Sequence, residues 1–365
     1  MLCDRGKRWK VALAVGLLGL LGQAGLAESA SGSNPPQGYV GRNTCASCHK
    51  EKAKLHFASP HRHTWKPVSA LDEMPGLPQE ASEGSIRHRV SKVDGKWSYT
   101  AQLPGRPAQV IPIHSIVGGE RFGISFIMRA EEIEGRKLPA PTLIEGRFMI
   151  EAGTHRLKKS PGLFKGQPSS YDTALGRVLN PDFADKCLGC HTGPVDVRLA
   201  QAGGPHPQFG DVGVTCEQCH GPGADHVRAA ENKEQNLRIV HPGKLSNPEL
   251  HKICSQCHSG FFSLVRPRPE DVLISNQVTA LTSSECYIQS AAGLSCLDCH
   301  DPHSQAVEDD SVYEAACRNC HSPAIRSSAT CPVNPKEGCI TCHMPANDQP
   351  GNFHLVDHWI RVVRR

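Results

Sequence analysis

The chain has 365 residues, which is enough for one large domain or two ordinary ones. Only 5 % of the residues are aromatic, whereas glycine (34) and proline (28) are plentiful, so the apolar core that side chains can form is thin for this length. The formal net charge of +4 includes the basic residues of the N-terminal segment. A charge this small gives no reason to expect a nucleic-acid partner.

The first 27 residues have the pattern of a secretory signal peptide. Basic residues precede an apolar run of eleven residues at 11–21, and small residues follow at Gly25 and Ala27. The run is too short for a membrane span, which needs about 20 apolar residues. We therefore expect residues 1–27 to be removed, the mature chain to lack a transmembrane segment, and the protein to lie in the periplasm or an equivalent space.

Fourteen of the 17 cysteines fall into seven copies of Cys-x-x-Cys-His. In this motif two thiols join the two vinyl groups on one edge of a porphyrin, and the adjacent histidine lies beneath the iron as its proximal ligand. Zinc sites do not require a histidine after every second cysteine, and a disulfide scaffold leaves the histidines unexplained. The sequence therefore predicts seven covalently attached haem c groups with their iron, numbered 1 to 7 in chain order. The attaching cysteines are Cys45, Cys48, Cys187, Cys190, Cys216, Cys219, Cys254, Cys257, Cys296, Cys299, Cys317, Cys320, Cys339 and Cys342, and the proximal ligands are His49, His191, His220, His258, His300, His321 and His343.

The spacing of the motifs predicts three parts after the signal. A first haem-binding segment spans residues 28–83, a β-rich insert spans about 84–157, and a six-haem block spans 158–365. Within the insert, residues 85–90 alternate in polarity, Asp94 and Gly95 form a hairpin turn, and Trp97 and Tyr99 share one face of the next strand. We expect a mainly α-helical and irregular multihaem cytochrome fold with a haem-filled core, plus this small β-rich insert.

The iron of each haem has a second axial position, and histidine on both sides is typical of low-potential electron-transfer haems. Four histidines are the favoured distal ligands: His61, His226, His303 and His354. His226 and His303 follow proximal histidines too closely to reach the far side of the same haem, so each is expected to bind a neighbouring one. Less favoured candidates are His56, His63, His241 and His358, followed by His88, His114 and His155 in the insert.

Two cysteines, Cys286 and Cys331, lie outside the motifs. In an oxidising compartment a disulfide between them is the expectation, and a thiolate ligand or redox-active thiol is the alternative.

Several segments resemble the cytochrome c-554 family and its multihaem relatives. The resemblance is carried by the segment TCEQCHGPGADHV at 215–227, by the opening haem segment at 41–65, by the later motifs at 254–259, 295–303 and 338–345, and by the ending at 357–360. It implies stacked haem pairs, mostly bis-histidine iron, a periplasmic electron-transfer role and His226 as a distal ligand.

Two functions follow from these patterns. The first is an electron carrier that uses closely spaced, mostly bis-histidine haems between redox partner proteins in the periplasm or at the membrane surface. The alternative is a multihaem oxidoreductase in which one open haem acts on a small nitrogen or sulfur species, beneath a pocket covered by Arg121, Arg129, Arg147 or Arg156 of the insert. The carrier is favoured, and no catalytic residue is assigned.

Overall fold

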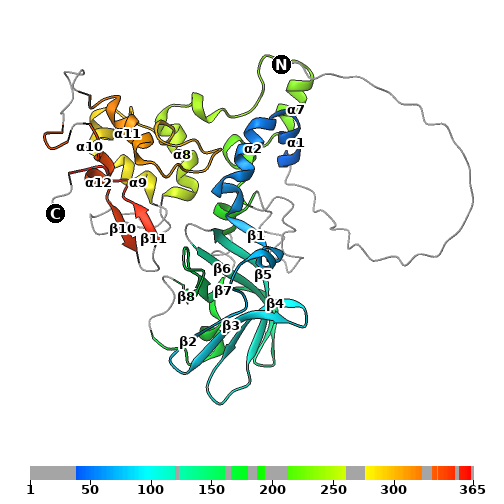
Figure 1. The fold of residues 1–365 in the computed structure, drawn as a ribbon. Helices are drawn as coiled ribbons and strands as arrows, with labels where there is room; N and C mark the ends of the chain where they lie inside the picture. Colours follow the sequence, from blue (N-terminus) through cyan, green and yellow to red (C-terminus); the bar gives the residue numbers. More distant parts are fainter. Residues whose placement is uncertain are drawn as a thin grey trace, which may run out of the picture.

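A computed structural model of the chain describes residues 38–119, 123–160, 166–179, 187–193, 213–259, 276–322, 331–334, 336–349 and 353–362. The expected signal peptide and Arg121 lie outside these ranges. The described chain has two halves, a β-sheet half and a half of short helices that carries the seven motifs (Figure 1).

The sheet half is a nine-stranded antiparallel sheet with the order β2-β3-β4-β5-β6-β7-β8, in which β1 pairs with β5 and β9 pairs with β7. Its strands are β1 (Trp65–Pro67), β2 (Gln79–Glu83), β3 (Ile86–Val93), β4 (Lys96–Gln102), β5 (Gln109–Gly119), β6 (Gly123–Ile133), β7 (Arg136–Ile150), β8 (Leu157–Lys159) and β9 (Gly176–Leu179).

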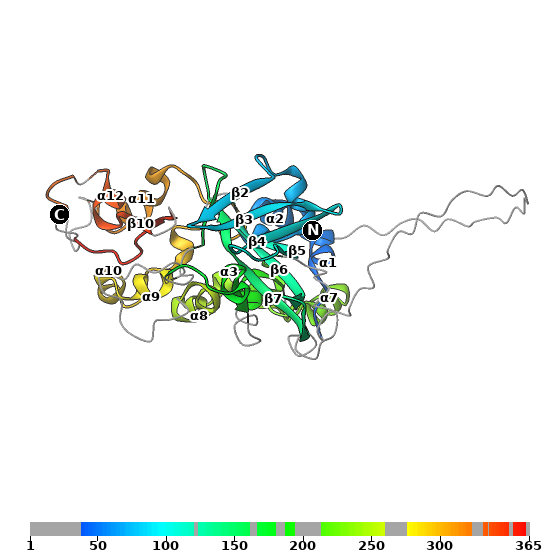
Figure 2. The same ribbon diagram turned by 90° about the horizontal axis from the view of Figure 1, so that it is seen from below.

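The sheet curls into a nearly closed barrel because its two edge strands, β2 and β8, are in contact. The Gln79 side chain bridges the two edges, since its amide donates to the carbonyl of His155 and accepts from the N–H of Leu157. Closure removes the exposed strand edges that an open sheet would leave. The barrel lies beneath the helices in Figure 1 and beside them in Figure 2.

The expected fold class, mainly α-helical and irregular with a small β-rich insert at about 84–157, is wrong. The barrel runs from Trp65 to Leu179 and is a major part of the described structure. Its interior is filled by side chains such as Tyr99, Ile116 and Phe126, none of which is exposed to solvent. The composition of the whole chain suggested a thin core. It is an average, and the apolar residues of this core are concentrated in one stretch of the chain.

The hairpin predicted around Asp94 and Gly95 is present as β3 and β4. Both turn residues have positive φ, 49° and 76°, which is the conformation of a two-residue type I′ turn. Ile86, His88 and Val90 alternate into the barrel, as their spacing predicts.

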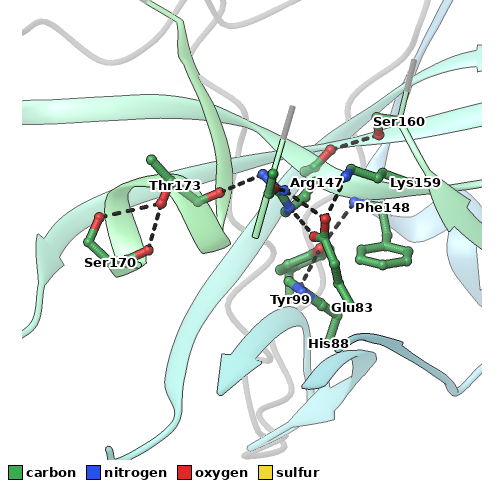
Figure 3. A network of polar contacts seen from close by, with 11 residues as sticks. Glu83, His88, Tyr99, Arg147, Phe148, Lys159, Ser160, Ser170 and Thr173 are labelled. Atoms are coloured by element: carbon green, nitrogen blue, oxygen red, sulfur yellow. Dashed lines mark hydrogen bonds and ion pairs between the residues drawn. The ribbon is translucent and has the colours of Figure 1, made fainter. Parts of the chain in front are cut away.

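A buried ionic network crosses the barrel interior (Figure 3). The fully buried Arg147 guanidinium donates two hydrogen bonds to the Glu83 carboxylate and others to the carbonyls of Thr173 and Gly166. Lys159 makes a second ion pair with Glu83. These contacts tie β2, β7 and β8 together with the chain that leads to β9.

Replacing Glu83 by alanine is expected to destabilise the protein by about 3–5 kcal/mol, because it leaves the buried Arg147 without its counter-charge. Glu80→Ala is the matched control on the same strand: its pair with Arg89 is exposed and contributes less than about 1 kcal/mol. Urea unfolding of both variants measures the difference. An equal loss in the two variants would contradict the stabilising role of the buried pair.

The same network gives a pH dependence. The hydrogen bond from Arg147, aided by Lys159, lowers the pKa of Glu83 to about 2. A carboxyl with a depressed folded-state pKa stabilises the fold above its unfolded pKa, near 4.5, and this contribution disappears as pH falls through the folded value. We expect the barrel to lose stability between about pH 5 and pH 2, and the slope to be smaller in Glu83→Ala.

The other half consists of short helices, 3₁₀ turns and a two-stranded ribbon. The α-helices, with α3 beside the barrel, are α1 (Arg42–Cys48), α2 (Lys50–Ala58), α3 (Tyr171–Ala174), α6 (Cys216–His220), α7 (Ala224–Glu231), α8 (Asn247–His258), α9 (Gln277–Thr282), α10 (Glu285–Gln289), α11 (Asp310–Arg318) and α12 (Cys339–His343). The 3₁₀ turns of this half are η1 (Pro60–His63), η3 (Pro242–Lys244) and η4 (Cys296–Asp298), and the ribbon pairs β10 (Ala346–Gln349) with β11 (Phe353–Val356). The turn η2 (Val68–Glu73) belongs to the sheet half, where Leu71 is part of the barrel core.

Candidate haem-binding centre

One continuous cavity of about 4400 Å³ runs through the helical half. The two cysteines and the histidine of all seven motifs line it. A pocket for one small ligand typically measures about 300–1,000 Å³, so this cavity has room for several large groups.

Few side chains fill the interior of this half. Among the described residues after 186, the buried apolar side chains are those of Leu188, Ala229, Leu250, Val278 and Leu281. A protein interior is normally packed without large voids. The lining of thiols, imidazoles and apolar side chains therefore fits covalently attached porphyrins, which supply the missing apolar bulk.

At two motifs, capping residues define where the helical turn that carries the cysteines begins. Thr215 forms a capping box with Gln218, so α6 begins at the first cysteine of motif 3. Ser295 and Asp298 do the same for η4 and motif 5. In a capping box the two side chains satisfy free N–H groups of the first turn, which fixes the direction in which the cysteines project.

Four pairs of imidazole rings face each other across the cavity. Their ring centroids are all 6.1 Å apart, and each pair joins a motif histidine to a histidine from another segment: His49 to His226, His220 to His303, His258 to His61, and His300 to His358.

The common separation fits two ligands on one metal. Imidazole nitrogens bind transition metals at about 2.0 Å, so the two coordinating nitrogens are about 4 Å apart. Each ring centroid lies roughly 1 Å behind its nitrogen, which places the centroids about 6 Å apart. The spacing of all four pairs therefore leaves room for one iron between each two rings.

Hydrogen bonds to Nδ1 orient these rings. The Nδ1 of His61, His220, His226 and His358 donates to the backbone carbonyls of Pro302, Val240, Leu237 and Val356, respectively, at 2.8–3.1 Å. His343 donates in the same way to the carbonyl of Arg361 at 3.0 Å. A proton held at Nδ1 leaves the Nε2 lone pair available to a metal, and metal-binding histidines usually have such a partner.

Burial also favours the neutral, ligating form of the rings. It lowers the pKa of His220, His258, His300 and His358. The same cause lowers the pKa of His191. Neutral imidazole is the form that binds a metal.

Three of the four favoured distal histidines, His61, His226 and His303, lie opposite motif histidines. For His354 the structure describes the backbone, in β11, and its side chain lies outside the description. His358, a less favoured candidate, faces His300. This pairing has no signature in the sequence, because 58 residues separate the two histidines and no local pattern links them.

Of the arginines suggested for an enzyme pocket, the three that the structure describes do not line the cavity. Arg147 is inside the barrel, Arg129 pairs with Glu131, and Arg156 is exposed. The barrel instead contributes Arg177 of β9, which lines the cavity and is paired with Glu145 of β7. Burial raises the pKa of the Cys187 thiol of motif 2 to about 11; the charge of Glu145 raises this pKa further, and the charge of Arg177 lowers it.

Cys286 and Cys331 also line the cavity, and no bond joins them in the structure. The thiols near Cys286 are those of motifs 5 and 6, and Cys331 lies near Cys339 of motif 7. The expected disulfide is therefore not formed here.

Comparison with known proteins gives the same picture. A sequence profile of the family "Cytochrome c554 and c-prime" matches residues 165–221. The dissimilatory sulfite reductase MccA of Wolinella succinogenes is 24 % identical over 183 residues, which cover 40 % of this chain and 24 % of that protein. The multiheme cytochrome MtrA of Shewanella baltica is 27 % identical over 187 residues, which cover 39 % of this chain and 54 % of that protein. The chain thus matches only about a quarter to a half of the length of these relatives.

Among solved structures, the outer cell wall cytochrome OcwA has a similar fold. The TM-score is 0.50 at 15 % identity, over 90 % of this chain and 80 % of that one. Seven motifs around one cavity, the cytochrome relatives and this shared fold agree. The chain is a multihaem c-type cytochrome that resembles the cytochrome c554 family.

Proposed function

We propose that the protein carries electrons between redox partner proteins through seven covalently attached haems, most of them with two histidine ligands. The observation that carries the proposal is the set of four facing imidazole pairs, each at 6.1 Å. An iron with two protein ligands has no free position for a substrate, so its chemistry is limited to gaining and losing one electron.

The residues that hold each haem follow from the motifs. Two cysteines form the thioether bonds, and the following histidine is the proximal ligand. His226, His303, His61 and His358 are the distal ligands of haems 1, 3, 4 and 5. The bound haems supply the redox chemistry, while the protein fixes their positions and tunes their potentials through axial ligands and burial.

We further place the protein in the periplasm or an equivalent space. The support is the signal-like pattern of residues 1–27 and the usual association of haem attachment with export. In the described part of the chain, no helix is long and apolar enough to cross a membrane.

A haem count tests this proposal. The intact mass of the exported protein is expected to exceed that of the polypeptide by seven haems, with seven irons per chain. Changing Cys216 and Cys219 together to serine should remove one haem, whereas changing Cys286 to serine, the matched control, should remove none. A haem-free protein, or one with zinc in place of iron, would contradict the proposal.

A second function, that of an oxidoreductase with one open haem, is favoured by one observation. Among the described residues no imidazole is paired with His191 or His343, and the Nδ1 of His191 is buried without a hydrogen-bond partner. Arg177 and Glu145 lie on the barrel side of motif 2. Cyanide or nitric oxide binding to a single haem, lost when haem 2 is removed (Cys187→Ser with Cys190→Ser), is the result this function predicts.

A further inference from the structure

The order of the motifs in space differs from their order in the sequence. Motif 1 is next to motif 3, and the thiols of Cys45 and Cys216 lie close together. The carboxylate of Glu217, inside motif 3, accepts the backbone N–H groups of Val40 and Gly41 at 2.9 Å each. Glu217 is buried, so this contact fixes the two motifs against each other.

Motif 4 follows motif 3 and precedes motif 5. The thiol of Cys254 lies near those of Cys219 and Cys296. His220 of motif 3 contacts Val240, and the turn η3 that follows packs against α8, which carries motif 4. The side chain of Asn247, at the start of α8, donates to the carbonyl of Ala292 at 2.8 Å. Motif 4 is thus held between motifs 3 and 5.

Motif 6 is next to motif 5. The thiols of Cys299 and Cys317 are neighbours. The ring of Tyr313, on the helix that carries motif 6, lies 5.3 Å from the ring of His300.

Motif 7 follows motif 6. The thiols of Cys317 and Cys339 are neighbours. The buried carboxylate of Glu314 accepts the N–H groups of Gly338 and Ile340 at 3.2 and 3.3 Å. This carboxylate therefore fixes motifs 6 and 7 against each other, as that of Glu217 fixes motifs 1 and 3.

Motif 2 does not lie in this row. The thiol of Cys190 lies near that of Cys257 and 3.5 Å from the carbonyl oxygen of Gln256, both in motif 4. Gln218 of motif 3 donates to the carbonyl of Gly189 at 3.1 Å. Motif 2 therefore joins the row from the side, at motifs 3 and 4.

The other side of motif 2 faces the barrel. Leu188 is buried in a cluster with Trp65, Leu143 and Leu179 of the sheet. The hydroxyl of Thr64, just before β1, donates to the carbonyl of His191 at 2.8 Å. Motif 2 is thus one of the places where the barrel contacts the cytochrome half.

We propose, resting on the electron-carrier function above, that haems 1, 3, 4, 5, 6 and 7 form a single row in that order and that haem 2 is a side branch at haems 3 and 4, against the barrel. Figure 1 agrees with the row, since its labelled helices run from α1 and α7, through α8, to α11 and α12. One electron moving along the row oxidises one ferrous iron and reduces its ferric neighbour, and the donor and acceptor are the redox partner proteins.

The contacts between motifs give the row its two ends. Among the described residues, motif 1 contacts motif 3 at one end, and motif 7 contacts motif 6 at the other. Partner proteins are therefore expected to exchange electrons with haem 1 at one end and with haems 6 and 7 at the other.

The positions of the irons test this order directly. In crystals of the haem-loaded protein, anomalous scattering at the iron edge is expected to show six irons in the row 1-3-4-5-6-7, with the iron of haem 2 off the row and nearest to haem 3 or 4. Seven irons in another order would overturn this inference and leave the carrier function standing. Fewer than seven irons would overturn the carrier function as proposed.

A kinetic experiment tests the row. A ruthenium photosensitiser attached to Val362→Cys, an exposed site that lines the cavity near motif 7, injects one electron by flash excitation. In the background His226→Met, haem 1 is expected to have a raised potential and a distinct spectrum, so the arrival of the electron there can be followed. Removing haem 5 (Cys296→Ser with Cys299→Ser) should slow its arrival at least tenfold.

Cys286→Ser, which removes no haem, is the matched control and should leave the rate unchanged. An unchanged rate without haem 5 would overturn the proposed order. If the protein without haem 5 fails to fold, the iron positions still decide the question.

Discussion

Produced without haem attachment, the protein is expected to keep a folded β-barrel and to lose the structure of its cytochrome half. The haems would fill a cavity of about 4400 Å³, around which few apolar side chains are buried. Without them the cytochrome half lacks the apolar bulk that a packed interior needs, and its short helices cannot offset this penalty.

The barrel is independent of this penalty because its own side chains fill its interior. Limited proteolysis followed by mass spectrometry measures the difference. The haem-free chain should give a resistant fragment close to residues 65–179, and the haem-loaded chain should resist cleavage throughout the motif region as well. Equal protection of residues 213–322 with and without haem would contradict the structural role of the haems.

Replacing His226 by methionine is expected to raise the reduction potential of one haem by on the order of 100 mV, because histidine–methionine ligation favours ferrous iron and axial ligands set potentials over about 0.8 V. The ring of His226 faces that of His49, so the haem affected is haem 1. A redox titration followed by optical absorption should show one of seven steps moved upward. The EPR signal of one bis-histidine haem should disappear at the same time.

His155→Met is the control for this variant. His155 is exposed at a barrel turn, and its replacement should leave every potential unchanged. A titration curve that is the same for His226→Met and for the unmodified protein would rule out His226 as an axial ligand.

Much of the candidate site can be predicted from the sequence, because haem attachment depends on local chemistry. The adjacency of two cysteines and a histidine is visible within five residues, and the position of His226 soon after His220 excludes binding to the same haem. The pairing of His358 with His300 depends instead on where the C-terminus folds. Ser284 holds that segment by accepting the N–H of Ile360, a contact with no sequence signature.

The full extent of the barrel could not be predicted from the sequence, for two physical reasons. Strand β1 is three residues long and pairs with β5, which lies some 50 residues away along the chain. Strand β7 contains Pro139 and Pro141, which argue against a strand because proline cannot donate to the ladder. The sheet accommodates them in a register shift, where Ala130 pairs with Thr142 but Glu132 pairs with Lys137.

The two buried carboxylates that hold motifs together were also missed. Glu217 and Glu314 look like ordinary surface residues, since glutamate is rarely buried without partners. Each is buried because backbone N–H groups from a distant segment supply its hydrogen bonds. Such partners cannot be found in a single sequence.

Low-temperature EPR of the fully ferric protein, before and after addition of cyanide, tests the bis-histidine electron carrier most directly. The two ligand rings of haems 1, 3 and 5 lie at 20–30° to each other, which predicts rhombic low-spin EPR signals. The rings of His61 and His258 lie at 71°, which predicts a more anisotropic signal for haem 4. The reason is that perpendicular ligand planes leave two iron orbitals nearly equal in energy. We expect low-spin signals of these two kinds that cyanide does not change. A high-spin signal that cyanide converts to low spin would contradict the carrier and favour an enzyme with an open haem.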